Sequence, residues 1–429
     1  MDLRVYLDTL GCRLNESEIE QIGRAFSRLG HEIVRDASEA NLFVINTCAV
    51  TNEAGKKSRQ MIRWAHRQSP EAQIIVTGCY SEIERPKVEA MPGVVRVVAN
   101  TKKDRLVPDL LGISEEEWMD QEPLARELNP GDLRRTRAFV KAQDGCDNRC
   151  TFCVTTIARG QGRSRPLQEL INEVNAFYES GYQEVVLSGV HLGSYGKDLE
   201  GDLTIRDLVQ SLLDETDFPR IRLSSLEPWD IPEGFFDLWY NSRMCQHLHM
   251  PLQAGCNKTL KRMARRTRVD AFRGLVEEAR RVMPSVGISS DIIVGFPGET
   301  EEDFQESLAF TDEMNFCHTH IFRYSQRPGT AAATMPNQLD GTIKSARSEA
   351  MHEIAARNRI AFDEKHIGQT LDVLWEQQLE ETPEGTWWQG LTSNYIKVKT
   401  LAPRPLHNLI TPVLLEERRD DGTVQGRLV

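Results

Sequence analysis

Short apolar runs alternate with amphipathic segments along the first hundred residues. Strand-like runs are "LRVYLDTL" (3–10), "NLFVINT" (41–47), "QIIVTG" (73–78) and "VVRVVA" (94–99), with helical patterns between them. Asn15 followed by Glu18 resembles a capping box at the start of the first helix, and Gly30 predicts its end. This βαβ alternation predicts a mostly parallel, doubly wound α/β sheet.

The middle of the chain repeats a strand–helix unit six times between about residues 134 and 367. The strands are near "AFVKAQ", "EVVLSG", "RIRLSS", "HLHMPL", "ISSDIIVGF" and "HIFRYS". A helix is expected over 166–180, because Pro166 suits its first turn and Gly181 follows its end. Six consecutive units predict a partial (β/α)6 barrel whose chemistry lies at the carboxyl ends of its strands.

The last sixty residues have short strand patterns and turn signals such as Asp421-Gly422. They predict a small antiparallel β-barrel. The acidic segment 113–133 contains two prolines and is expected to be a linker. The chain is therefore expected to divide into domains at 1–125, 134–366 and 367–429.

Composition narrows the possible classes of protein. The 429 residues carry 52 Lys and Arg against 64 Asp and Glu, a net charge of −12. Such a balance disfavours general attraction to nucleic acid but allows a local basic face. No apolar run has the length of a membrane span, and the start "MDLRVYLDTLGC" lacks a signal-peptide pattern. A cytoplasmic protein without a membrane partner is expected, so its nine cysteines are expected to be metal-binding, catalytic or buried.

Three cysteines lie close together in "GCDNRCTFC", at Cys146, Cys150 and Cys153. They follow the first strand of the predicted barrel and therefore lie at its mouth. A C-x3-C-x2-C loop without a fourth ligand suits structural zinc poorly, because zinc prefers four protein ligands. It suits a four-iron cluster held by three thiolates, whose fourth iron is open to a substrate.

Three further cysteines, Cys12, Cys48 and Cys79, stand far apart in the sequence. Each follows a predicted strand, in "DTLGC", "VINTC" and "IVTGC". The carboxyl ends of parallel strands share one edge of the sheet, so the three thiols are expected to converge there. The alternative is three unrelated buried cysteines, which is the less favoured interpretation because all three occupy the same structural position.

The loop that holds Cys146, Cys150 and Cys153 resembles that of a known family. "CDNRCTFC" followed by "ARGQGRSRP" resembles the radical S-adenosylmethionine (SAM) enzymes. The resemblance implies that the open iron binds SAM and that one electron cleaves it to methionine and a deoxyadenosyl radical. It also implies that Phe152 lies near the adenine. Stretches similar to the SAM pocket of the family are "GVHLGSYG", "HMPLQAG" and "DIIVGFPGETEEDF", and the candidate contacts are Gly189, Ser225, Glu227 and Gln253.

The whole chain resembles the methylthiotransferases among these enzymes. This implies that Cys12, Cys48 and Cys79 hold a second [4Fe-4S] cluster, whose open iron binds the inserted sulfur. "TLGCRLNESE" and "NTCAVTNEAGKKSRQMIR" are most similar to enzymes that modify C2 of N6-threonylcarbamoyladenosine at position 37 of tRNA. The alternatives are dimethylallyladenosine and a ribosomal protein. The implied partners are tRNA, a flavodoxin- or ferredoxin-like electron donor and a sulfur donor.

The tail resembles a TRAM domain, an RNA-binding module. Its candidate RNA contacts are Trp387, Trp388, Tyr395, Lys397 and Lys399, with a core role as the alternative for each aromatic ring. Basic runs that suggest phosphate contacts lie at 56–67, 134–137, 159–165 and 261–268, although such runs also occur as solvated helix faces.

The remaining candidates carry weaker signals. Cys245, Cys256 and Cys317 have no ligand spacing and are expected to be structural, while His191 and His249 are expected to line the site or the core. A hypothesis of another class is a non-catalytic RNA-binding protein with a structural metal. A cobalamin enzyme is disfavoured, because residues 1–112 lack an Asp-x-His-x-x-Gly signature.

Overall fold

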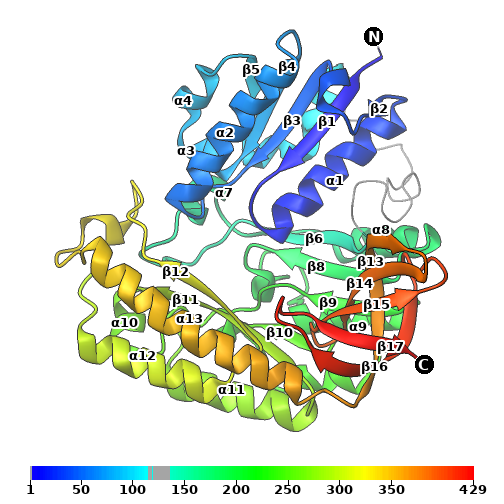
Figure 1. The fold of residues 1–429 in the computed structure, drawn as a ribbon. Helices are drawn as coiled ribbons and strands as arrows, with labels where there is room; N and C mark the ends of the chain where they lie inside the picture. Colours follow the sequence, from blue (N-terminus) through cyan, green and yellow to red (C-terminus); the bar gives the residue numbers. More distant parts are fainter. Residues whose placement is uncertain (1, 115–117, 119–135) are drawn as a thin grey trace.

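A computed structural model describes residues 2–114, 118 and 136–429 (Figure 1). The predicted linker and the start of the basic run 134–137 fall almost entirely outside these residues. No helix in the described parts of the chain combines the length and apolar character needed to cross a membrane.

The N-terminal lobe is built on a five-stranded, fully parallel sheet in the order β2-β1-β3-β4-β5. Its strands are β1 (Arg4–Thr9), β2 (Glu32–Ile33), β3 (Leu42–Thr47), β4 (Gln73–Gly78) and β5 (Val94–Val97). Its helices are α1 (Arg13–Arg28), α2 (Asn52–Gln68), α3 (Cys79–Ile83), α4 (Arg85–Glu89) and α5 (Leu106–Leu111). Helices α1 and α5 pack on one face of the sheet, and α2, α3 and α4 pack on the other. The predicted doubly wound sheet is therefore present.

The start of α1 differs from the prediction. Cys12 is the N-cap residue, so Asn15 and Glu18 lie inside the helix, and the predicted capping box was wrong. Both side chains are buried and make polar contacts elsewhere: Asn15 Nδ2 donates to the Leu10 carbonyl at 2.7 Å, and Glu18 accepts from Lys103 Nζ at 2.6 Å. Buried polar groups need partners, and these contacts supply them.

The middle of the chain has six parallel strands in sequence order. They are β6 (Ala138–Asp144), β8 (Glu184–Gly189), β9 (Arg220–Leu223), β10 (His247–His249), β11 (Gly287–Val294) and β12 (His318–Arg323). Strands β6-β8-β9 and β10-β11-β12 form two sheets, and isolated parallel bridges such as Ser225 with His249 join them. The short β7 (Arg163–Ser164) pairs antiparallel with β6.

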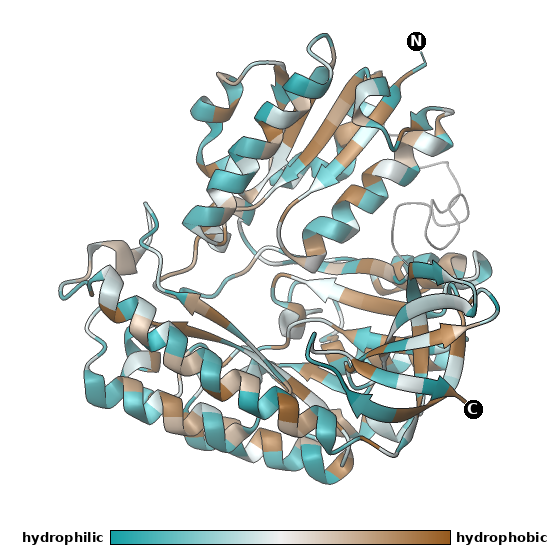
Figure 2. Cartoon of the chain, viewed as in Figure 1, coloured by the Kyte–Doolittle hydropathy of each residue, from teal (hydrophilic) through white to brown (hydrophobic). Residues whose placement is uncertain are grey.

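Helices follow most of these strands and cover their outer side (Figures 1 and 2). They are α7 (Thr155–Arg159), α8 (Leu167–Glu179), α9 (Ile205–Glu215), α10 (Asn257–Arg262), α11 (Val269–Val282), α12 (Glu301–Met314) and α13 (Gly341–Glu364). After β9 only 3-10 turns occur, at Pro228–Asp230 and Phe235–Tyr240. Leu248 and Ile288 join the core beneath the helices, so the alternate positions His249 and Ser289 face the opposite side, the lumen.

The C-terminal strands close into a ring in the order β13-β14-β15-β17-β16. They are β13 (Thr370–Thr382), β14 (Gly385–Thr392), β15 (Lys397–Ala402), β16 (Ile410–Arg418) and β17 (Val424–Leu428). The pairing is antiparallel as predicted except between β15 and β17, which run parallel. This exception arises because β17 turns back from β16 and then lies between β16 and β15. Its pairing with β15 closes the ring.

A buried ionic group attaches these strands to the middle sheet. The Glu184 carboxylate accepts from Arg222 at 2.6 Å, and Arg222 also donates to the Ser393 carbonyl at 3.0 Å. Arg220 donates to the Asp372 carbonyl at 2.7 Å. The connection therefore depends on arginines of β9 that reach backbone oxygens of the C-terminal strands.

Candidate functional site

The first three thiols meet at one edge of the N-terminal sheet. Cys48 and Cys79 directly follow the neighbouring strands β3 and β4, and Cys12 follows β1, on the other side of β3. Burial raises the pKa of the Cys48 thiol to about 11, and the nearby thiols of Cys12 and Cys79 add to the shift. The expected convergence of three distant cysteines is therefore present, and we call them the first triad.

A glycine permits this close approach. Gly11 has a φ of +119°, a backbone conformation that suits glycine, and a Cβ atom there would lie 2.9 Å from Cys48 Sγ. No side chain fits at that distance. The loop after β1 can therefore bring Cys12 beside Cys48 only because residue 11 has no side chain.

The second triad, Cys146, Cys150 and Cys153, lies in the loop that follows β6. All three are half-buried, burial raises the pKa of the Cys146 thiol to about 12, and the thiols of Cys153 and Cys150 add to the shift. The Cys146 amide donates to the Gly160 carbonyl at 3.0 Å, which folds the loop back on itself. Val154, next to Cys153, packs into the core of the N-terminal lobe. The second triad therefore lies against the lobe that holds the first.

Arg265 stands beside the second triad. Its guanidinium donates to both oxygens of Glu227, at 2.5 and 3.1 Å, and to Cys150 Sγ at 3.8 Å. It stacks 4.4 Å from the centre of the Trp229 ring. Arg265 belongs to the basic run 261–268, from which phosphate contacts were predicted, but only 8% of its surface is exposed. The prediction was wrong for this residue, because its charge is turned inward to Glu227 and the thiol.

The other residues predicted around SAM lie near the carboxyl ends of the barrel strands. Gly189 ends β8, and Ser225 follows β9 and bridges to His249. Gln253 has a φ of +73°, and its backbone N–H donates to the Asp291 carbonyl at 2.8 Å. The ring of Phe152 packs edge-on against Phe296, 6.3 Å between centres. These positions surround the mouth of the strands.

His191 lies beside the loop of the second triad. Its Nε2 is 2.5 Å from Asp230, which also accepts from Lys197 at 2.6 Å. The Asn148 amide, within the triad loop, approaches the His191 ring at 3.4 Å. His191 therefore supports the loop from the next strand along.

Arg159 joins the helix that follows the second triad to the first triad. It follows the second triad in α7, is 2% exposed, and donates from Nε to Cys79 Sγ of the first triad at 3.3 Å. Its other nitrogens donate to Glu18 at 2.8 Å, Asp144 at 2.9 Å and Asn15 at 2.7 Å. No specific signal in the sequence points to this role, because Arg159 stands in the basic run 159–165, whose pattern predicts phosphate contacts or a solvated face.

Arg327, in the loop after β12, makes a second connection. It donates to the Ala49 carbonyl in the loop that follows Cys48 and, at 3.4 Å, to Asn52, the first residue of α2. Burial lowers the pKa of Arg327, and the thiols of Cys48 and Cys153, one from each triad, act against that shift. Among the described residues, no carboxylate lies within ion-pair distance of Arg327. Arg327 therefore joins the loop after β12 to the segment that follows Cys48.

The donor set of each triad fits an iron–sulfur cluster. Soft thiolates select iron–sulfur clusters and zinc, and N–H groups aimed at the sulfurs stabilise the negative charge of a bound cluster. Arg159 and Arg265 supply such groups to Cys79 and Cys150. The raised pKa values of Cys48 and Cys146 mean that a metal must displace protons from these two thiols on binding. The other three cysteines, Cys245, Cys256 and Cys317, are buried elsewhere, as expected of structural residues.

Most of the tail residues that were predicted to contact RNA pack against or bond other residues of the protein. Trp388 is 4% exposed in the core of the C-terminal strands, and Tyr395 stacks on His247 at 4.3 Å between ring centres. Trp387 packs against Arg419, and Lys399 bonds Asp421 at 2.6 Å. The core role is therefore the correct interpretation for Trp388, whereas Lys397 is exposed.

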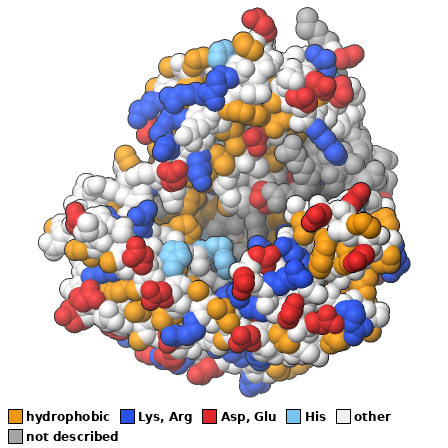
Figure 3. Space-filling view, in the orientation of Figure 1, with side chains coloured by type: hydrophobic (Ala, Val, Ile, Leu, Met, Phe, Trp, Pro, Cys, Tyr) orange, Lys and Arg blue, Asp and Glu red, His pale blue; other side chains and the backbone are white. Residues whose placement is uncertain are grey.

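Basic side chains gather on the N-terminal lobe, over α2 and α4 (Figure 3). The exposed cations of α2, from the predicted basic run 56–67, are Lys56, Lys57, Arg63 and Arg67. We call these four the α2 basic face. This face can attract phosphates without specifying a sequence.

Comparisons with known proteins agree with this geometry. Residues 4–100 match the family described as "Uncharacterized protein family UPF0004", and residues 140–311 match the Radical SAM superfamily. A protein of Bacillus subtilis (strain 168) named threonylcarbamoyladenosine tRNA methylthiotransferase MtaB is 36% identical over 92% of this chain and 89% of its own length. A protein of the same name from Thermotoga maritima is 33% identical, over 87% and 86%.

Relatives with a second name are also similar. A tRNA-2-methylthio-N(6)-dimethylallyladenosine synthase of Thermoanaerobacter sp. (strain X514) is 32% identical over 87% of this chain and 82% of its own length. A solved radical SAM methyltransferase, TsrM of Kitasatospora setae, shares the fold with a TM-score of 0.56 at 15% identity, covering 78% of this chain and 77% of that chain. The family implies a [4Fe-4S] cluster and SAM. The chain belongs to the radical SAM tRNA methylthiotransferases.

Proposed function

We propose that this enzyme inserts a methylthio group at C2 of N6-threonylcarbamoyladenosine at position 37 of tRNA, using two [4Fe-4S] clusters. The observation that supports the proposal is Arg159, a buried cation of the helix after the second triad, which donates to Cys79 Sγ of the first triad at 3.3 Å. Two cysteine triads joined in this way suit a reaction in which one site carries sulfur and the other generates a radical.

The residues divide between the two sites. Cys146, Cys150 and Cys153 are proposed to hold the cluster that supplies the electron for cleaving SAM. The first triad is proposed to hold the cluster that carries the sulfur. Because an adenine C–H bond has no useful acidity, general-base catalysis cannot activate it, and radical chemistry can.

SAM is proposed to bind between the second triad and the strand ends. Glu227 is oriented there by its two hydrogen bonds to Arg265, and it offers a carboxylate to an amino group. The supporting positions are Phe152, Gly189, Ser225 and Gln253. Arg265 also limits how far the carboxylate of Glu227 can turn.

The tRNA is proposed to be held by the three units together, at 1–125, 134–366 and 367–429, with the last acting as a TRAM-like module. The α2 basic face and Lys397 supply positive charge for the RNA backbone. A flavodoxin- or ferredoxin-like electron donor and a sulfur donor complete the proposed partners. The preference for the threonylcarbamoyl nucleoside is supported by the relatives of that name at 36% and 33% identity, against 32% for the dimethylallyl enzyme.

Mass spectrometry of tRNA nucleosides tests the reaction and the substrate. A host without its own methylthiotransferases would express the intact gene, or the gene with Cys150→Ala or Cys48→Ala. The methylthio form of threonylcarbamoyladenosine is expected only with the intact gene. A methylthio form of the dimethylallyl nucleoside alone would overturn the substrate, and unchanged nucleosides would direct the search to ribosomal proteins.

Iron analysis tests the two clusters separately. Each of Cys48→Ala and Cys150→Ala is expected to lower the iron content of the anaerobically reconstituted protein by about four atoms per chain. Cys256→Ala is the matched control, because Cys256 is buried outside both triads and bonds Glu306. Equal iron in Cys48→Ala and the unchanged protein would refute the second cluster.

A further inference from the structure

The lumen face of β10, β11 and β12 is polar. Asp291 and His320 are direct partners in the parallel pairing of β11 with β12, and His249 pairs with Ser289, two residues before Asp291. Because side chains alternate along a strand, His249, Asp291 and His320 share one face. We call these three residues the lumen triad.

The polar atoms of the lumen triad converge. One nitrogen or oxygen of each lies within 4.8 Å of the others. His249 Nε2 is 3.4 Å from Asp291 Oδ1, and its Nδ1 is 2.9 Å from Ser289 Oγ. The rings of His249 and His320 are 5.8 Å apart between centres. The side chains of His249 and Asp291 keep 15% and 23% of their surface exposed, so the group is open to a ligand.

Hydrogen bonds join the lumen triad to residues beside the second triad. The Gln253 backbone N–H donates to the Asp291 carbonyl at 2.8 Å, and Arg265 donates to the Pro251 carbonyl, two residues after His249, at 2.5 Å. Arg265 itself contacts Cys150 Sγ. Figure 3 shows a hollow between the N-terminal lobe and the rest of the chain, with histidine side chains at its lower edge. A group held by the lumen triad is therefore near the SAM-binding end of the barrel.

We propose that the lumen triad is the subsite that binds the N6 substituent of the target adenosine, and that it selects a polar, ureido-linked, carboxylate-bearing substituent over an apolar alkenyl one. This proposal rests on the proposed function. Asp291 accepts a ureido N–H, His320 donates to the substituent's oxygens, and His249, held by Ser289, positions the Asp291 carboxylate. A dimethylallyl group has neither that N–H nor those oxygens.

The selectivity follows from hydrogen bonding. An apolar substituent pressed against this face would separate imidazole and carboxylate groups from water without replacing their hydrogen bonds. A site built for hydrogen bonds rejects a ligand that lacks them far more strongly than an apolar pocket rejects an extra polar group. The lumen triad therefore disfavours the alkenyl nucleoside, because its imidazole and carboxylate groups would lose their hydrogen bonds to water and gain none from the ligand.

The test compares two anticodon stem–loop RNAs, one with the threonylcarbamoyl and one with the dimethylallyl nucleoside at position 37. The reconstituted protein and the His320→Phe and Asp291→Asn variants are measured for kcat/KM and for RNA binding without SAM. Both variants are expected to lower the preference for the threonylcarbamoyl RNA by about tenfold to a hundredfold. Cleavage of SAM to deoxyadenosine, measured in parallel, is expected to persist in His320→Phe, because His320 lies outside the stretches that resemble the SAM pocket.

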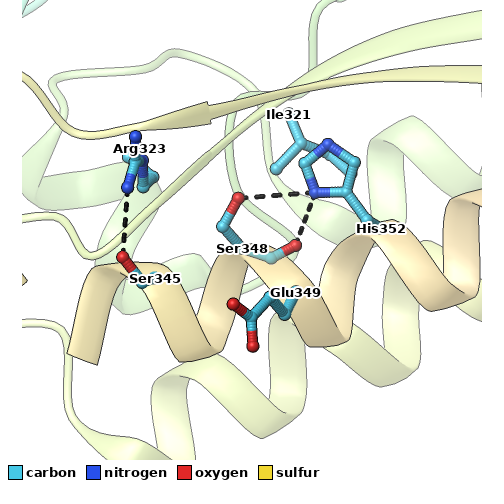
Figure 4. A pocket seen from close by; sticks show the side chains of 6 residues that line it. All are labelled: Ile321, Arg323, Ser345, Ser348, Glu349 and His352. Carbon is cyan, nitrogen blue, oxygen red and sulfur yellow. Dashed lines mark hydrogen bonds between the residues drawn. The ribbon is translucent and has the colours of Figure 1, made fainter. Parts of the chain in front are cut away.

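His352→Phe is the matched control. His352 lines a pocket of about 380 Å³ on the opposite side of β12, together with Ile321 and Arg323 (Figure 4). This pocket does not face the lumen, because Ile321 and Arg323 alternate with His320 along the strand. His352→Phe is expected to keep the full preference between the two RNAs.

The possible outcomes separate this inference from the proposed function. If the unchanged enzyme modifies neither RNA, the proposed function is wrong. If it modifies the threonylcarbamoyl RNA but the variants slow both RNAs equally, the lumen triad does not select the substituent. Stoichiometric binding of added Co²⁺ that is lost in Asp291→Asn, with unchanged preference between the RNAs, would identify a cation site and overturn the proposal.

Discussion

Arg159 offers the sharpest test of how the N-terminal lobe is joined to the barrel. The change is Arg159→Met, which keeps the length of the side chain and removes its charge and its N–H donors. In the intact protein the guanidinium donates to Glu18 at 2.8 Å and to Asp144 at 2.9 Å. Both the arginine and Glu18 are almost fully buried, at 2% and 1% side-chain exposure.

The expected loss is large because a buried carboxylate remains. Burial acts to raise the pKa of Glu18, but Arg159 and Lys103 outweigh it and hold that pKa well below its ordinary value. Removing one member of a buried ion pair costs about 3–5 kcal/mol, because the other charge stays away from water. Lys103 still pairs with Glu18 at 2.6 Å, so we expect the lower end, about 3 kcal/mol.

Urea unfolding at neutral pH, followed by circular dichroism, measures this loss. Arg163→Met is the matched control, because Arg163 lies four residues on, approaches Asp144 at 3.6 Å and is 44% exposed. Its loss is expected to stay below about 0.5 kcal/mol. The double variant Arg159→Met/Glu18→Gln is expected to lose less than the sum of its parts. Equal losses for Arg159→Met and Arg163→Met, or strict additivity with Glu18→Gln, would refute the reasoning.

Other measurements address the remaining connections. Burial acts to raise the pKa of Glu184, but Arg222 and its neighbours lower it from 4.5 to about 2. Its contribution, roughly 3 kcal/mol, is therefore present above pH 4.5 and lost as the pH falls toward 2, and Glu184→Gln should remove that dependence from acid unfolding curves. Gly11→Ala is expected to displace Cys48 and to lower the iron content of the reconstituted protein as Cys48→Ala does, and full iron would contradict this. Reversing the charges of the α2 basic face is expected to weaken tRNA binding at least tenfold at low salt and less at high salt, and unchanged binding would exclude that face.

The order and type of most elements could be predicted from the sequence alone. Alternating apolar runs predicted the parallel sheets, and the position of each cysteine after a strand predicted the first triad, because these are properties of local pattern and of the carboxyl edge of a sheet. The spacing of Cys146, Cys150 and Cys153 predicts a metal-binding loop, because that spacing is a property of neighbours in sequence. These features depend on neighbours in sequence or on strand ends that share an edge.

The roles of Arg159, Arg265 and Arg327 could be decided only by the tertiary structure. In the sequence, the first two belong to basic runs that also occur on solvated surfaces, and the third stands in a loop without a motif. Whether an arginine faces water or a buried carboxylate depends on which distant segment packs against it, and local pattern carries no such information. The burial of Trp388 and the shared face of the lumen triad depend in the same way on long-range pairing. The sequence thus determined which residues could bind metal, and the packing of the lobes decided which charges surround them.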